Sequence, residues 1–220
     1  MVDIAHLCYY PITAAGSVNR VVGRQIERLK DFRHVLISYD PRGRVETNKD
    51  GFVVVPGEKY AAARRLLGCV PGRIREQYCG FESVDQIVWL HRARQVLEKH
   101  KPPVIVSHDH YKIGRWLRGW VSWPCRFVLT QHGFAYSGLK EPAEAVSGFD
   151  SVVFLTERSY RYCIDYSHSV TAAVEIIPNC IDTHCFRPLA QDERLAVREH
   201  IGLAGDSVAV VTVGRQVPKK

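Results

Sequence analysis

Short apolar runs alternate with longer helical segments along this chain, and this alternation limits the possible folds more than any other feature. The runs are rich in Val and Ile, and turn residues such as Pro56-Gly57 follow several of them. Strands that alternate with helices favour a mostly parallel sheet with helices on both faces. The expected strands are residues 4–9, 34–39, 52–55, 104–106, 127–130, 151–155 and 174–177. The sequence therefore predicts a Rossmann-like α/β fold.

Helical periodicity is clearest in residues 81–100, where Val84, Val88 and Leu97 belong to one apolar stripe and Pro102-Pro103 follows the segment. Three more helices are expected at residues 17–29, at residues 111–120, and from the end of the strand at 151–155 through residue 166. Their positions between the expected strands complete the α/β alternation.

The chain is expected to contain one complete domain and the beginning of another. At 220 residues it has room for one large domain, or for one domain and a piece of a second. The first domain is placed at residues 1–188. In the remaining residues 189–220, a helix is expected at 191–202 and a strand at 208–213. One helix and one strand are too little to fold alone.

The composition is typical of a soluble globular protein of the cytoplasm. Hydrophobic residues make up 46% of the chain and charged residues 24%. No run approaches the roughly 20 apolar residues of a membrane-spanning helix, and no secretory signal is recognised at the start. The seven cysteines are scattered and form no C-x-x-C pair, which favours reduced thiols over a disulfide framework. The expected location is therefore cytoplasmic.

Positive charge is concentrated in the middle of the chain. Residues 59–126 hold 13 Lys and Arg against 5 Asp and Glu, a net charge of +8, whereas the whole chain carries +7. A basic region in an otherwise balanced protein favours an anionic partner, such as nucleic acid, phospholipid headgroups or a phosphorylated substrate. A solvated basic face without a partner explains the charge equally well. Because no recognisable nucleic-acid motif is present, nucleic acid is not expected as a partner.

Two basic segments also carry apolar or Trp side chains, a combination that suits the surface of an anionic membrane. Residues 59–75 combine Arg65 and other basic residues with Leu66 and its apolar neighbours. Residues 112–123 combine Lys112, Arg115 and Arg118 with Trp116, Trp120 and Trp123. Peripheral contact with the inner face of a membrane is one interpretation, and Trp residues in the core beside solvated Arg residues are the alternative.

Four groups of polar residues follow expected strands. The groups are Gly16-Ser17, His108-Asp109-His110, His132-Gly133, and Asn179 to Asp182. In open α/β sheets, ligands bind beyond the carboxyl ends of the strands. The shared placement of the four groups therefore predicts a binding site along this edge of the sheet.

Gly16 and Ser17 open the helix expected after the first strand. Amide groups at a helix amino terminus can hydrogen-bond a phosphate or a sugar, and a glycine lets the ligand approach closely. The pattern is neither G-x-G-x-x-G nor a P-loop, so it supports neither dinucleotide nor nucleoside-triphosphate binding. An ordinary capped helix is the alternative interpretation.

The histidines at positions 108, 110 and 132 allow three interpretations. Ligands at i and i+2 of a strand end, with no clear fourth partner and no H-E-x-x-H motif, are a weak metal pattern, so no metal is expected. A metal-dependent hydrolase would be the corresponding alternative function. Histidines can also hydrogen-bond a hydroxyl or transfer protons near neutral pH, and a histidine at a strand end can be purely structural.

Four segments, spread over nearly the whole chain, form a set of motifs. Residues 174–182 read V-E-I-I-P-N-C-I-D, and Phe186-Arg187-Pro188 follows them. Residues 211–215 read V-T-V-G-R, residues 104–110 read V-I-V-S-H-D-H, and residues 129–133 read L-T-Q-H-G. In order and spacing, the four resemble the v-I-P-N-G-V-D-…-F-x-P, v-G-R-L-x-x-x-K-G, D-V-V-H-A-H and v-T-x-H-G segments of the family 4 glycosyltransferases.

The resemblance implies the amino-terminal, acceptor-side half of a GT-B enzyme, in which two Rossmann-like domains face each other across a cleft. Such enzymes move a sugar from a nucleotide-sugar donor to a glycan or lipid-linked acceptor, often of the cell envelope, typically with retention and without a metal. The resemblance makes His132 the catalytic residue that reaches the sugar or the acceptor. It assigns acceptor binding to His108, Asp109 and His110, and donor binding to Gly16, Ser17, Gly133, Asn179, Asp182, Arg215 and Lys220.

The chain departs from the family pattern in three places. A single Gly16 stands where the family often has two glycines, and Cys180 replaces the glycine of I-P-N-G. The family's donor-binding E-x7-E segment would lie beyond Lys220. Arg215 and Lys220 stabilise a departing diphosphate only if they are held in place. We therefore expect the 220-residue chain to be inactive by itself, and the alternative is a non-catalytic module that binds an acceptor or a membrane.

Overall fold

The computed structural model describes residues 2–9, 17–43, 47–49, 51–57, 60–72, 74, 84–132, 146–165, 172–179, 181–204 and 207–211. The chain divides into two compact units, Met1–Asn179 and Cys180–Lys220. The domain boundary expected after residue 188 falls inside the second unit and stays a prediction.

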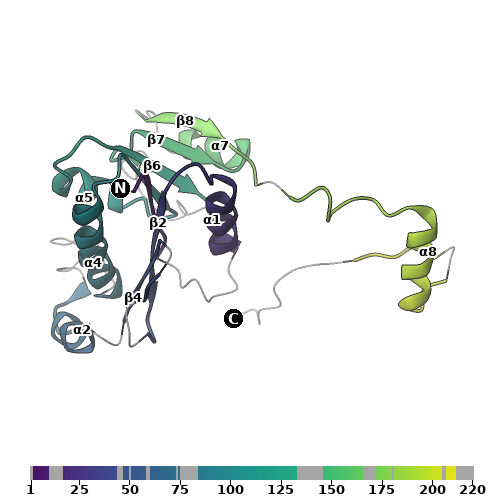
Figure 1. Cartoon of the computed structure of the whole chain (residues 1–220), viewed down its shortest axis with the longest axis horizontal. Coiled ribbons are helices and arrows are strands. Elements are labelled where there is room, and N and C mark those ends of the chain that lie inside the picture. The colour runs from purple at the N-terminus through teal and green to yellow at the C-terminus, as the bar shows by residue number, and fades with distance from the viewer. Residues whose placement is uncertain are drawn as a thin grey trace. The chain divides into compact units, whose positions relative to one another are not determined.

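An eight-stranded sheet forms the centre of the first unit (Figure 1). Its order is β3-β4-β2-β1-β5-β6-β7-β8, and all neighbours pair in parallel except β3, which is antiparallel to β4. The strands are β1 (Ile4–Leu7), β2 (His34–Asp40), β3 (Thr47–Lys49), β4 (Phe52–Pro56), β5 (Val104–His108), β6 (Arg126–Gln131), β7 (Ser151–Phe154) and β8 (Ala173–Ile176). The predicted Rossmann-like sheet is confirmed.

The edge strand β3 is an element that the apolar pattern did not predict. Its residues Thr47, Asn48 and Lys49 are all polar, so no apolar run marks them. Gly51 connects β3 to β4 with a φ of +80°, and a Cβ at this position would lie 2.6 Å from the His34 carbonyl oxygen. The turn therefore requires glycine, and β3 is a strand because this turn brings it against β4.

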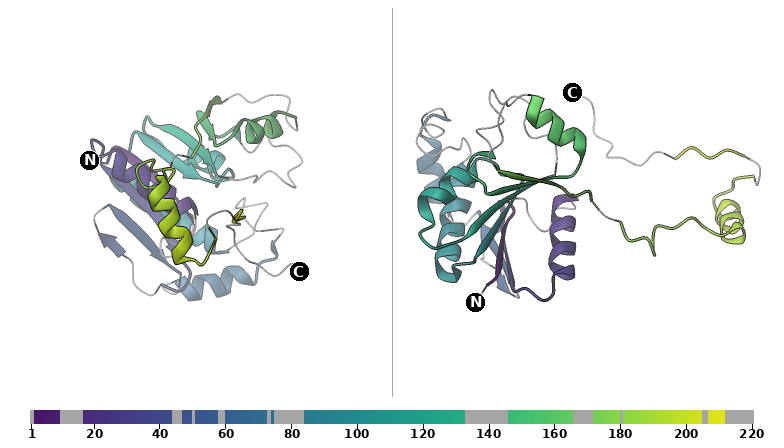
Figure 2. Two further views of the ribbon diagram at one scale, coloured as in Figure 1. Left: turned by 90° about the vertical axis from the view of Figure 1, so that its right-hand side faces the viewer. Right: turned by 90° about the horizontal axis from the view of Figure 1, so that it is seen from above.

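Helices cover both faces of the sheet, as predicted. The described helices of the first unit are α1 (Ser17–Arg28), α2 (Ala61–Gly68), α4 (Val84–His100), α5 (Ile113–Trp120) and α7 (Glu157–Asp165). Helices α4 and α5 lie on one face and α1 lies on the other (Figure 2). Four of these helices fall within the segments that the periodicity indicated, whereas α2 was not predicted.

The main core lies where α4 and α5 pack against the sheet. It contains Leu7, Ile37, Ile105 and Leu129 of the strands, Trp89, Leu90 and Leu97 of α4, and Ile113 and Leu117 of α5. A smaller cluster joins Val22 of α1 to Cys8 and Leu36. Leu36 and Ile37 are adjacent in β2 and both are buried, so the sheet is covered on both faces. This burial explains why its strands read as continuous apolar runs.

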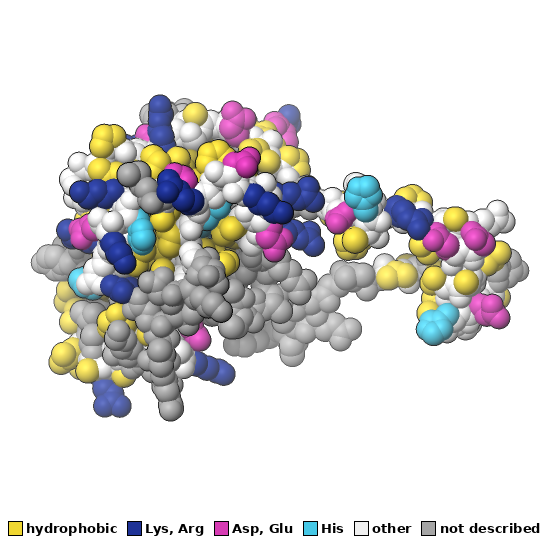
Figure 3. Space-filling view, in the orientation of Figure 1, with side chains coloured by type: hydrophobic (Ala, Val, Ile, Leu, Met, Phe, Trp, Pro, Cys, Tyr) yellow, Lys and Arg dark blue, Asp and Glu magenta, His cyan; other side chains and the backbone are white. Residues whose placement is uncertain are grey.

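The second unit contains the helix α8 (Gln191–His200). Its described residues include no strand, so the strand predicted at 208–213 is wrong for residues 208–211. Val208, Val210 and Val211 are 79% to 89% exposed. A strand forms by pairing its backbone groups with a neighbour, and the described part of this unit supplies none. Hydrophobic side chains also lie at the surface around α8 (Figure 3).

Candidate functional site

The predicted residues after β5 and β6 lie together at one edge of the sheet. In the parallel pairing of these strands, His108 is opposite Thr130, so His132 lies just beyond the same edge. The backbone N–H of Asp109 donates to the Thr130 carbonyl oxygen at 3.0 Å and joins the two strand ends. Two of the four predicted groups therefore meet where ligands bind in open α/β sheets.

Asp109 holds His132 in place. Its φ of +62° lies in the left-handed region, which Asp tolerates better than most residues. In this conformation one carboxylate oxygen, Oδ1, accepts the backbone N–H of His132 at 2.6 Å and the Nε2 amide of Gln131 at 3.2 Å. The turn after β5 thus fixes the backbone after β6, which makes Asp109 a positioning residue for His132.

The two ring nitrogens of the half-buried His132 have different surroundings. Its Nε2 lies 3.1 Å from Nδ1 of His108, whereas Nδ1 is buried and has no hydrogen-bond partner among the described residues. Burial lowers the pKa of His132, although the charge of Asp109 acts in the opposite direction. The ring is therefore neutral near pH 7, with one nitrogen that donates and one that accepts.

His108 is fully buried and is linked to histidines on both sides. Its Nδ1 contacts His132, and its Nε2 lies 3.1 Å from Nδ1 of His6 in the neighbouring strand β1. Burial holds the pKa of His108 well below the ordinary value, and the nearby histidines lower it further. Both ring nitrogens are occupied by other side chains, so His108 reaches the site through His132. Its predicted contact with an acceptor stays a prediction.

His110 lies beside the same edge but contacts aromatic rings. Its imidazole meets the ring of Tyr9 edge-on, with centroids 5.3 Å apart, and lies 5.5 Å from the ring of Trp89. Burial lowers the pKa of His110 to about 4, so this ring is also neutral near pH 7. The Ser107 hydroxyl donates to the His110 carbonyl oxygen at 3.0 Å and fixes the turn.

The remaining predicted site residues belong to other parts of the chain. Ser17 is the first residue of α1. Asn179 is exposed and ends the first unit, whereas Asp182 belongs to the second, where its Oδ1 accepts the backbone N–H of His184 at 2.9 Å. Gly16, Gly133, Arg215 and Lys220 lie outside the described residues, so their donor-binding roles stay predictions.

Sequence reasoning missed two histidines of this cluster, His6 and His34. His6 lies inside the apolar run of β1, and His34 is the first residue of β2. A histidine in or next to each of four neighbouring strands was a usable signal, but the strand order was needed to recognise it. Among the described residues, no group of three His, Cys, Asp or Glu side chains is arranged to hold a metal ion.

Among the described cysteines, Cys8 and Cys163 are buried, whereas Cys69 and Cys185 are exposed. Within the described segments, no helix has the length and apolar character needed to cross a membrane.

Comparison of the chain with protein-family models and with curated proteins finds no match in either set. Comparison with solved structures finds a sucrose-phosphate synthase from Thermosynechococcus elongatus, with a TM-score of 0.58 and 14% sequence identity. The match covers 94% of this chain and 54% of the synthase, so the chain spans about half the length of that protein. At this identity the likeness shows a shared fold. The chain has a Rossmann-like α/β fold that agrees with one half of a GT-B glycosyltransferase.

Proposed function

We propose that this chain is the acceptor-side half of a glycosyltransferase. In the complete enzyme it would move a sugar from a nucleotide-sugar donor to a glycan or lipid-linked acceptor in the cytoplasm, with retention and without a metal. Two findings support the proposal: the fold is shared with a sucrose-phosphate synthase, and His132 lies just beyond the carboxyl ends of β5 and β6, with a buried Nδ1 that has no hydrogen-bond partner among the described residues. The second finding carries the most weight, because fold alone does not specify function.

The chemistry expected at this edge is the handling of a sugar hydroxyl. A neutral imidazole nitrogen accepts a hydrogen bond from a hydroxyl and can take its proton as the oxygen attacks. Asp109 keeps His132 in position through the backbone. On the donor side, the departing diphosphate gains negative charge, and we propose that Arg215 and Lys220 stabilise this charge in place of a divalent ion.

The first test is the substitution His132→Ala in an enzyme that combines this chain with a donor-binding domain. Turnover should fall by roughly 10²-fold or more, the effect expected for a lost proton-transfer group or transition-state contact. His91→Ala is the matched control, because His91 is an exposed histidine of α4 whose ring contacts only Gln95 among the hydrogen bonds described. Unchanged turnover in a well-folded His132 variant would remove this residue from the site.

A non-catalytic binding module is the second candidate, and the second unit favours it for the isolated 220-residue chain. The exposed residues Val208, Val210 and Val211 have no sheet to enter among the described residues. Because the edge near His132 belongs to the first unit, a binding module would need only that unit to hold an acceptor. Calorimetry with candidate acceptors, together with an assay of nucleotide-sugar turnover, separates binding without transfer from catalysis.

A further inference from the structure

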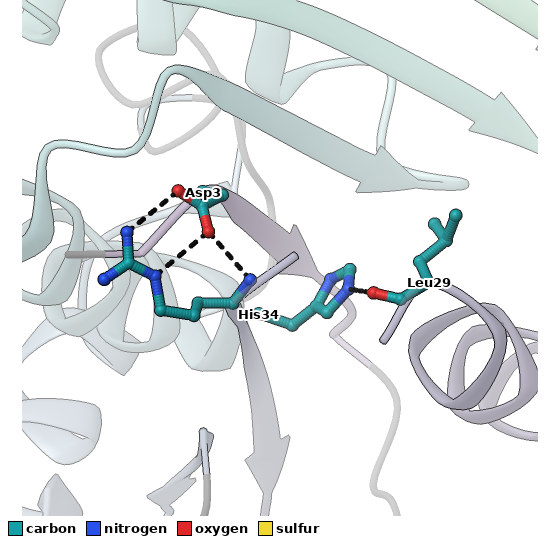
Figure 4. Close-up of polar contacts among 4 residues, drawn as sticks. Asp3, Leu29 and His34 are labelled. Atoms are coloured by element: carbon teal, nitrogen blue, oxygen red, sulfur yellow. Dashed lines mark hydrogen bonds and ion pairs between the residues drawn. The ribbon is translucent and has the colours of Figure 1, made fainter. Parts of the chain in front are cut away.

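Four histidine rings form a continuous hydrogen-bonded row across the sheet. His34 Nδ1 lies 3.1 Å from His6 Nε2, His6 Nδ1 lies 3.1 Å from His108 Nε2, and His108 Nδ1 lies 3.1 Å from His132 Nε2. Successive ring centroids are 5.3, 5.4 and 5.3 Å apart. At the far end, the Nε2 of His34 lies 2.9 Å from the Leu29 carbonyl oxygen (Figure 4).

The strand register explains why the row is continuous. In the parallel pairs, the residue opposite one histidine is always two positions before the next histidine of the row. The paired residues are His34 with Ile4, His6 with Val106, and His108 with Thr130. Because side chains alternate between the faces with a period of two, this constant step keeps the first three histidines on one face. The row therefore runs diagonally across the sheet, from the amino ends of the strands at His34 to their carboxyl ends at His132.

The Leu29 carbonyl sets the direction of every hydrogen bond in the row. A carbonyl oxygen only accepts, so Nε2 of His34 must carry the hydrogen and Nδ1 of a neutral His34 must accept. His6 then donates from Nε2 to His34, and its own Nδ1 accepts from Nε2 of His108. His108 in turn accepts on Nδ1 from Nε2 of His132. The only arrangement for four neutral rings leaves a lone pair on Nδ1 of His132, the atom that has no partner among the described residues.

The rings of the row differ in how well they accommodate positive charge. His6 and His108 are 3% and 0% exposed, and burial lowers the pKa of His6 to about 4. His34 is half-buried and contacts the carbonyl of Leu29, just after α1 ends at Arg28. The carboxyl end of a helix carries partial negative charge and stabilises a cation. Positive charge is therefore better placed on His34 than on the buried rings of His6 and His108.

The charged and titratable groups around the row are few. His108 is near His110, and His132 is near Asp109. Beside His34, the guanidinium of Arg33 makes a two-pronged ion pair with Asp3, and the two charges largely offset each other (Figure 4). The other charged residues near Leu29 are the exposed Arg28, Lys30 and Asp31. None of these groups places a full unpaired negative charge beside a buried ring of the row.

We propose that the four histidines are a proton relay that carries a proton from a hydroxyl bound at His132 to His34 on the other edge of the sheet. As the hydroxyl O–H bond breaks, an N–H bond forms at Nδ1 of His132. The Nε2 protons of His132, His108 and His6 each move to Nδ1 of the next ring, and His34 becomes an imidazolium. After the product leaves, the reverse shift releases the proton from His132 to water. The nature of the hydroxyl rests on the proposed sugar transfer, but the relay itself does not.

The relay can be tested without any enzymatic assay, by ¹⁵N NMR of the histidine rings in the full chain during a pH titration. At neutral pH all four rings should be Nε2–H tautomers. When the row takes up a proton on acidification, His6, His108 and His132 should switch to Nδ1–H tautomers in the same step. Protonation of the row with these three tautomers unchanged, or a neutral-pH Nδ1–H tautomer at His132, would overturn the relay.

Two variants isolate the relay from simple structural effects. His6→Phe removes both the donor and the acceptor at this position, so the tautomer of His132 should no longer change on acidification. His34→Gln removes only the charge-accepting ring, and it decides the question if His6→Phe does not fold. In the complete enzyme, His34→Gln should lower turnover by roughly 10-fold and remove one ionisation from the pH profile of turnover; His91→Gln should change neither. If the complete wild-type enzyme transfers no sugar, the proposed function is contradicted. The relay is then still tested by the NMR experiment.

Discussion

At the scale of single residues, Asp109 fixes the position of His132, the candidate general base. Its left-handed backbone turns the chain after β5, and its carboxylate binds the backbone N–H of His132. Both properties suit Asp, which tolerates this conformation and accepts strong hydrogen bonds from amides. The geometry of the site thus depends on a residue whose role is to position its neighbour.

Replacing Asp109 should therefore cost stability in a graded way. Asp109→Ala loses the bonds to His132 and Gln131 and keeps an unfavourable backbone, so the free energy of unfolding should fall by about 1–3 kcal/mol. Asp109→Asn retains an acceptor oxygen and the tolerance of positive φ, so it should lose about 1 kcal/mol or less. Urea denaturation of the three proteins measures the difference. Equal losses for Ala and Asn would argue against the hydrogen bond as the cause.

At the scale of elements, α5 is held unusually close to the turn before β7. A Cβ on Gly148 would lie 2.3 Å from the carbonyl carbon of Gly114 in α5, which leaves no room for a side chain. From the same helix, Arg118 donates to the Gly148 carbonyl oxygen at 3.2 Å and to Asp150 Oδ1 at 2.5 Å. The guanidinium also lies 4.8 Å from the centre of the Phe127 ring. Close packing and these hydrogen bonds thus hold α5 against the turn before β7.

This close approach predicts a large effect for one added methyl group. Gly148→Ala should force α5 away from the turn and lower the free energy of unfolding by about 1–3 kcal/mol. Gly119→Ala is the matched control, since Gly119 is also in α5 but a Cβ there meets nothing within 4 Å. That change should be neutral or should stabilise the helix by up to about 1 kcal/mol. Denaturation midpoints that move equally for both variants would contradict the packing explanation.

At the scale of the whole molecule, some side chains of the basic region at residues 59–126 are packed or paired, whereas others are exposed. Trp116, Trp120 and Trp123 pack against the main core, and Trp123 donates from Nε1 to the Pro102 carbonyl oxygen at 3.0 Å. Arg118 is paired with Asp150. In contrast, Leu66 of α2 is 74% exposed. On the face shown in Figure 3, basic side chains are interspersed with acidic ones. A membrane contact is therefore better supported by α2 than by the Trp segment.

We predict that the chain sediments with anionic vesicles through α2 and that salt weakens the binding. Arg65→Gln should weaken binding about fivefold, since one basic residue near an anionic surface contributes about 1 kcal/mol. Arg24→Gln removes the same charge from an exposed position of α1 and should have little effect. Equal sedimentation with neutral and anionic vesicles, unaffected by salt, would count against an electrostatic membrane site.

The fold class and most of the strands and helices could be predicted from the amino-acid sequence, which also predicted the edge of the sheet for the candidate site. These features depend on local apolar periodicity and on the rule that ligands bind beyond the strand ends. It also identified the segments after β5 and β6, because a histidine after an apolar strand is visible in the sequence alone.

Which residues lie together could be learned only from the folded structure. β3 forms because a turn brings it against β4. Residues 208–211 of the strand expected at 208–213 form no strand, because they pair with no neighbouring strand among the described residues. The Trp residues of the basic segment are partly buried and pack against the core, although their spacing also suited a membrane surface. Above all, the row from His34 to His132 depends on the strand order and on a repeated two-residue offset in register. Pairing between strands that are distant in the sequence is set by the packing of the whole sheet, so no local pattern reveals it.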